Sequence, residues 1–170
     1  MIVIVALETN NKYGSDYYYF KSILSRFYQE RGTGIKIQPV FMNGKTNYKN
    51  IKSKIENIKK QYSVDTDESN VIYFLDEDNP ELNCDQKILN EEIKQYCSEY
   101  KYEIVWFNKT IEDVLLGKVI TKDKTNEAKK FFENELIYKV DKKQLYTGAH
   151  SSHSSNVLII LDNYLTKKDN

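Results

Sequence analysis

The stretches that decide the fold are MIVIVALE at residues 1–8 and VIYFLDEDN at residues 71–79. Each begins as an unbroken apolar run rich in β-branched residues, which is typical of a strand buried on both faces inside a parallel sheet. Each run then stops at acids, the first at Glu8 and the second at the triplet 76–78. The two stretches therefore predict strands with carboxylates at their carboxyl ends.

Extended and helical patterns alternate around these two strands. IKIQPVFM at 35–42 predicts another strand, in which Pro39 favours an edge position, and YEIVWF at 102–107 predicts a fourth. Apolar residues at helical spacing predict the connecting helices. The order β-α-β-α-β-α-β implies a parallel sheet with right-handed crossovers and helices on both faces. The predicted helices run from about Ser15 to Gly32, from Tyr48 to Tyr62 and from Cys84 to Tyr100.

The predicted fold class is therefore α/β, with a four-stranded parallel sheet in the order 2-1-3-4. Three crossover helices and the buried character of the first and third strands place those two strands side by side. Residues 1–117 are expected to form this core, and residues 118–170 a small helical extension of the same domain. The extension contains a predicted helix at about 126–136 and another from Val157, after the polar loop at 148–156.

Composition narrows the function classes. The chain has 25 Lys+Arg and 25 Asp+Glu residues, so no overall field attracts it to DNA or to a membrane. No apolar run approaches the roughly 18 residues of a membrane span, and the run at 1–7 lacks a basic front end. We therefore expect a cytoplasmic protein with no membrane partner. Cys84 and Cys97 have neither zinc nor disulfide spacing and are expected to be free thiols.

The acids at the strand ends are the candidates for chemistry. In an open α/β sheet, ligands bind beyond the carboxyl ends of the strands. Asp76 and Asp78, two apart in an extended chain, are expected to point to one side, where they repel unless a cation lies between them. With Glu8 on the neighbouring strand, the carboxylates could bind Mg²⁺ or Mn²⁺ and keep one acid/base group. The alternative is that these acids only cap a helix or occupy a solvated turn.

The order β-α-β-α-β-α-β, with Glu8 closing the first strand and the D-x-D of 76–78 closing the third, resembles the Toprim domain of topoisomerases, primases and small nucleases. The chain is most similar to compact Toprim-like proteins of the RloB type and to nucleases of the overcoming-lysogenization-defect type. The similarity rests on ALE at 6–8, on the aromatic run YYYF at 17–20 and on VIYFLDEDN at 71–79. It covers residues 1–117.

The resemblance implies a Mg²⁺-dependent (or Mn²⁺-dependent) nuclease or phosphodiester-transfer domain. Glu8 would be the general acid/base or a further ligand, Asp76 and Asp78 would bind the metal, and Glu112 would help to hold a second ion. For Glu112 the alternative is a solvated acid favoured by the helix dipole. RloB-type proteins occur in bacterial defence and restriction loci, so the resemblance extends to bacterial or mobile-element defence. The neutral charge predicts weak nucleic-acid binding by the chain alone, and hence a protein partner.

Other polar residues have plainer interpretations. Lys45 and Lys109 follow strand ends and could support a transition state, but among so many lysines they are expected to be ordinary surface cations. His150 and His153 lie in a polar loop with no obvious third ligand, and we expect neither to bind metal. Trp106 and the tyrosines at 17–19 are expected to pack in the core, with base stacking by one of these tyrosines as the alternative.

Two function classes remain after these observations. The first is a metal-dependent nuclease of the Toprim type. The second is a catalytically inactive Toprim-like or flavodoxin-like module that regulates or binds a partner, which the neutral charge favours. A sugar-nucleotide glycosyltransferase using the D-x-D of 76–78 ranks last, because that fold normally needs a longer chain.

Overall fold

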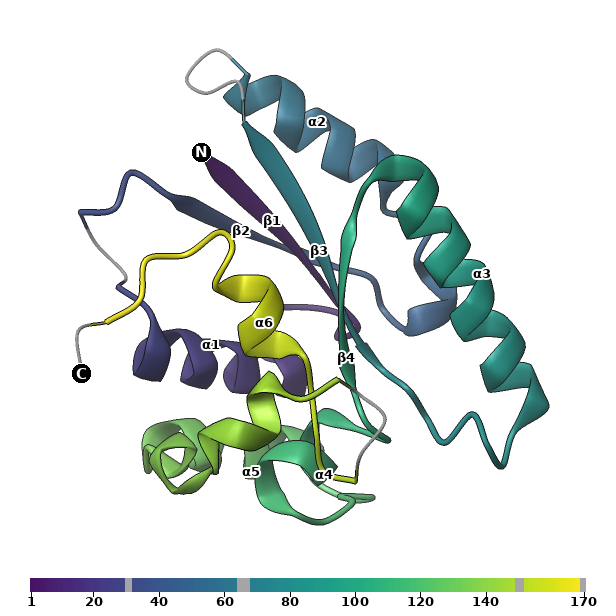
Figure 1. Ribbon diagram of the computed structural model, residues 1–170, viewed down its shortest axis with the longest axis vertical. Coiled ribbons are helices and arrows are strands. Elements are labelled where there is room, and N and C mark those ends of the chain that lie inside the picture. The colour runs from purple at the N-terminus through teal and green to yellow at the C-terminus, as the bar shows by residue number, and fades with distance from the viewer. Residues whose placement is uncertain (30–31, 64–67, 149–151, 169–170) are drawn as a thin grey trace.

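A sheet of four parallel strands forms the centre of the protein, in the predicted order β2-β1-β3-β4 (Figure 1). The computed structural model describes residues 1–29, 32–63, 68–148 and 152–168. The strands are β1 (Ile2–Leu7), β2 (Lys36–Phe41), β3 (Ser69–Asp76) and β4 (Glu103–Phe107).

Burial explains why two of the strands are unbroken apolar runs. All six residues of β1 are buried, as are residues 71–75 of β3, because helices cover both faces of the sheet. Pro39 lies in β2 at the edge of the sheet, as predicted, where a residue without a backbone N–H is best tolerated.

Alternating residues of β1 belong to two separate cores. Val3, Val5 and Leu7 pack under one layer of helices, and Ile2, Ile4 and Ala6 pack under the other. The first layer contains α1 (Ser15–Phe27), α4 (Ile111–Leu116), α5 (Lys124–Glu133) and α6 (Val157–Leu161). The second contains α2 (Lys52–Tyr62) and α3 (Cys84–Tyr100), on the opposite side of the sheet in Figure 1. Short 3-10 turns are η1 (Lys45–Asn47), η2 (Leu136–Lys139) and η3 (Lys142–Tyr146).

Two helices are shorter than the sequence predicts. α2 begins at Lys52 rather than at Tyr48, whose ring packs edge-on against Tyr96 with the centroids 5.3 Å apart. α1 ends at Phe27, because Tyr28 turns into extended backbone and its hydroxyl donates to Asp162 Oδ1 at 2.8 Å. Both helices are thus cut short by contacts with distant parts of the chain.

The C-terminal segment covers the outer edge of β4. The Asn156 side chain accepts from the amide of Trp106 at 2.8 Å and donates to the carbonyl of Ile104 at 3.0 Å. Phe107 forms an antiparallel bridge with Ser155. The segment therefore satisfies backbone groups that an edge strand would otherwise leave open. Among the described residues, no helix is long and apolar enough to cross a membrane.

Candidate functional site

Glu8 and Asp76 meet at the carboxyl edge of the sheet. β1 and β3 are parallel neighbours, with Leu7 opposite Phe74, so the residues that follow them emerge side by side. The backbone amide of Asp76 donates to Glu8 Oε1 at 2.7 Å. Asp76 Oδ1 in turn accepts from the amide of Ile111 at 2.8 Å. Asp76 therefore links the end of β3 to the first residue of α4.

Asp78 does not continue the extended chain that the sequence predicts. Its φ of 55° lies in the left-handed region, and its amide donates to the carbonyl of Lys109 at 2.9 Å. Its carboxylate forms an ion pair with Lys45, with Nζ and Oδ2 2.7 Å apart. The expectation that Asp76 and Asp78 lie on one side of an extended strand is therefore wrong, because the strand ends at Asp76 and the chain turns there.

Lys45 is a buried cation, and its interpretation as an ordinary surface lysine is wrong. Only 5% of its surface is exposed. Its ammonium donates to the carbonyl of Asp76 and to Asp78 Oδ2, at 2.7 Å in each case. The amide of Gly44 donates to the carbonyl of Glu8 at 2.7 Å, which folds the loop after β2 across the end of β1. This contact places Lys45 next to Asp76 and Asp78.

Asp16 is a residue of this site that the sequence presented only as a helix cap. Its Oδ2 accepts from the amide of Thr9 at 3.0 Å and its Oδ1 accepts from Ser15 Oγ at 2.9 Å. The cap of α1 is Gly14 instead, where a Cβ would lie 1.4 Å from Thr9 Oγ1. The available signal was an acid in the first turn of the helix that directly follows β1.

Glu112 is buried rather than solvated, so the alternative of a solvated first-turn acid is wrong. Its exposed fraction is 1%, and within the described chain neither of its carboxylate oxygens has a hydrogen-bond partner. Lys124 Nζ lies 3.5 Å from Glu112 Oε1. Burial follows from α4, which is only six residues long and packs against the core.

Asp113, the next residue, is also buried and lies beside His153. His153 Nδ1 is 3.0 Å from Asp113 Oδ2 and 3.1 Å from the Asp113 carbonyl. His150 lies outside the described residues. The contacts of His153 are thus with the end of α4, and they leave the expectation that the histidines do not bind metal untested.

Four carboxyl groups form what we call the acidic cluster: Glu8, Asp16, Asp76 and Glu112. Burial raises the pKa of Glu8 to about 8; repulsion from Asp16 adds to the effect, while the Asp76 amide and Lys45 oppose it. Burial, followed by repulsion from Glu8, Asp16 and Glu112, raises the pKa of Asp76 well above its usual range. The pKa of Asp16 is raised by burial and by Glu112. Glu8, Asp76 and Asp16 therefore bind protons more tightly than ordinary carboxyl groups do, and a nearby cation would oppose this effect.

The chemistry of the acidic cluster suits a hard divalent cation, although its atoms are not gathered around one point. All its ligand atoms would be carboxylate oxygens, which Mg²⁺ prefers, and the two oxygens of Glu112 have no hydrogen bond to any described residue. Within the described ranges, however, no group of three or more His, Cys, Asp or Glu residues is arranged to hold a metal ion. Metal binding would therefore require these side chains to move closer together.

The fold and the acidic cluster define a class: a parallel α/β protein with buried and half-buried carboxyl groups at the carboxyl edge of its sheet. Comparisons with family models, with curated proteins and with solved structures give no match for this chain.

Proposed function

We propose that this protein is a Mg²⁺- or Mn²⁺-dependent phosphodiester hydrolase or transferase of the Toprim type, acting on nucleic acid. The observation that carries the proposal is the contact of Glu8 with Asp76 at the carboxyl edge of adjacent parallel strands, inside the acidic cluster. Ligands of open α/β sheets bind at this edge. The burial of Glu112 in the same cluster adds support, because within the described chain its carboxylate has no hydrogen bond and only the partly exposed Lys124 as a counter-charge, at 3.5 Å.

The surroundings of each acidic residue indicate the role that it would have in catalysis. Asp76 and Glu112 are the candidate metal ligands, and a bound metal would polarise the phosphodiester and stabilise the leaving oxygen. Glu8 would act as general acid/base, since a pKa raised to about 8 lets it hold or release a proton near neutral pH. Asp78 is neutralised by Lys45, so it is a weaker candidate for a ligand than the sequence indicates.

Cleavage by a Glu8 variant tests this function. Glu8→Gln keeps an oxygen to accept the Asp76 amide but removes the titrating group. In millimolar Mn²⁺ or Mg²⁺ it should lose cleavage of single- or double-stranded DNA or RNA by roughly 10²- to 10⁴-fold. Glu133→Gln, at a side chain that is 56% exposed on α5, should cleave like the wild type. Equal cleavage by wild type and Glu8→Gln would refute the assignment.

The arrangement of the acidic side chains also supports a second function, that of a regulatory module without catalytic activity. The described residues hold no ready-made metal group, and the net charge is zero, so the chain could serve as a regulatory module that binds a protein partner. In that case the acidic cluster would be a structural feature. Absence of cleavage by the wild type, with either metal and with any protein that copurifies with it, would support this second function.

A further inference from the structure

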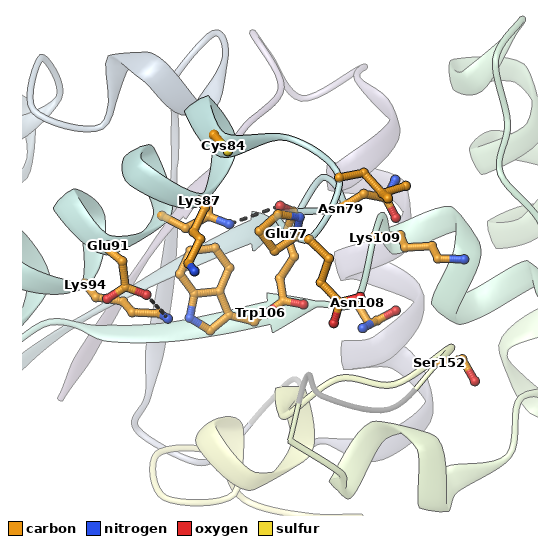
Figure 2. Close-up of a pocket in the computed structure, with 14 residues that line it drawn as sticks. Glu77, Asn79, Cys84, Lys87, Glu91, Lys94, Trp106, Asn108, Lys109 and Ser152 are labelled. Atoms are coloured by element: carbon orange, nitrogen blue, oxygen red, sulfur yellow. Dashed lines mark hydrogen bonds and ion pairs between the residues drawn. The ribbon is translucent and has the colours of Figure 1, made fainter.

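A pocket of about 680 Å³ opens between the start of α3 and the end of β4. Figure 2 shows the indole of Trp106 within it, with Lys87 and Lys94 of α3 on one side and Asn108 and Lys109 on the other. Glu77, the residue that follows Asp76 in the chain, lines the pocket and accepts a hydrogen bond from Asn90 of α3 through its carbonyl.

The indole ring of Trp106 lines the pocket, and the side chain of Lys94 lies over it. The ring is mostly buried, with 9% exposed, and the ammonium of Lys94 lies over it at 5.9 Å from the ring centroid. Lys94 itself is 46% exposed and pairs with Glu91 one turn away. A long, exposed side chain of this kind can move aside at little cost, which would open the indole face to a planar ligand.

Asn90 adds a hydrogen-bond acceptor that nothing in the described chain satisfies. Its Nδ2 donates to the carbonyl of Glu77 at 3.0 Å, which fixes the orientation of the amide. Its Oδ1 is buried and has no hydrogen-bond partner among the described residues, and the residue as a whole is 5% exposed. Asn90 lines the pocket, so a small movement of neighbouring side chains would let a ligand N–H reach this acceptor.

The charges around the pocket indicate what kind of ligand it favours. Three lysines line it, but so do three glutamates, and one of each forms the Glu91–Lys94 pair at 2.7 Å. The negative charges of the glutamates therefore largely cancel the attraction of the lysines for a phosphate group. An uncharged, planar group that carries an N–H donor fits the pocket better than an anion does, and a nucleobase has that chemistry.

We propose that this pocket binds a base of single-stranded nucleic acid, stacked on Trp106, with an N–H group of the base donating to Asn90 Oδ1. The proposal rests on the proposed function, since it states where a base of the substrate lies relative to the acids that would cleave the strand. The stacking residue in this proposal is Trp106, and not one of the tyrosines at 17–19, which the sequence offered as an alternative. Those tyrosines pack against the core.

Fluorescence of the chain's single tryptophan reports directly on this pocket. In buffer containing EDTA, which prevents metal-dependent cleavage, a deoxyadenosine octamer should quench Trp106 saturably. An abasic octamer of the same length and charge should quench it little. Free dAMP should bind more weakly than the octamer. Equal quenching by the abasic octamer, or none by the deoxyadenosine octamer, would overturn the proposal, and tighter binding of dAMP would overturn the assignment to a strand.

Two variants separate stacking from packing. In binding measured by anisotropy of a labelled octamer, Trp106→Leu should weaken affinity roughly 5- to 100-fold, and Trp106→Phe should retain most of it. Urea denaturation of both variants would show that the fold persists. Equal loss of affinity in the two variants would contradict stacking. Glu133→Gln, at an exposed position of α5, should bind the octamer like the wild type. Because these measurements need no cleavage, failure here is distinct from failure of the nuclease assignment.

Discussion

At the scale of single residues, the protein brings one buried and three half-buried carboxyl groups together in the acidic cluster. Glu8 is held by the amide of Asp76 and faces repulsion from Asp16 and Asp78, and burial is the main reason for its raised pKa. Lys45 partly offsets this repulsion. A group of this kind makes the stability of the fold depend on pH.

The expected dependence has a definite sign. The ordinary pKa of Glu8 is 4.5 and its folded pKa is about 8, so the folded state keeps a proton that the unfolded state releases between these values. The free energy of unfolding should therefore fall as pH rises from about 4.5 to about 8. Glu8→Gln removes this contribution and should be more stable than the wild type at pH 9, by roughly 2–4 kcal/mol.

Urea denaturation at pH 5, 7 and 9 would measure the effect. Asp16 and Asp76 also have raised pKa values, so Glu8→Gln should show a reduced slope with pH rather than none. Glu133→Gln, on the exposed face of α5, should keep the wild-type slope. Identical slopes in wild type and Glu8→Gln would contradict the burial of a protonated Glu8.

At the scale of elements, the edge of β4 depends on one side chain. Asn156 makes two hydrogen bonds to the strand, through Trp106 N and Ile104 O. Asn156→Ala should lower the free energy of unfolding by about 1.5–3 kcal/mol, because both backbone groups lose a partner. Asn50→Ala, at an exposed position with a single side-chain hydrogen bond to Asn47, should change it by less than about 0.5 kcal/mol. Urea denaturation that gives equal losses for both variants would contradict this role.

The sequence predicts best those strands and helices whose bounds depend on interactions between residues close together in the chain. The apolar runs at 2–7 and 71–75 are buried on both faces, and α3 begins at Cys84 and ends at Tyr100 as predicted. Asn83 caps that helix by accepting from the amides of Asp85 and Gln86, which is a short-range interaction. Strand order followed from the same local patterns, because crossover rules leave few arrangements.

The residues that sequence reasoning misplaced owe their positions to long-range contacts. Lys45 is buried only because the loop after β2 folds over the end of β1. Asp78 turns away because the backbone adopts a left-handed conformation, which a D-x-D pattern does not reveal. The acids at 8 and 76 were placed together correctly because adjacent parallel strands end at the same edge.

At the scale of the whole molecule, the acidic cluster joins parts of the chain that are far apart in sequence. Its members come from the end of β1, the start of α1, the end of β3 and the start of α4. Their mutual repulsion therefore acts against the docking of α1 and α4 onto the sheet. A cation among them would stabilise the fold as a unit, by mass action on the folded state alone.

Thermal denaturation in Mn²⁺ tests this coupling between metal and fold. For a weak site with a Kd of about 1 mM, 10 mM Mn²⁺ should add about 1.4 kcal/mol, which corresponds to a rise in Tm of roughly 3–6 °C for a chain of this length. Asp76→Asn removes a candidate ligand and should lose the rise, measured against its own Tm in EDTA, even if that Tm is higher than the wild type's. Glu133→Gln should keep the rise. A rise of equal size in Asp76→Asn would show that Mn²⁺ binds elsewhere, and no rise in the wild type would remove the metal from the proposed function.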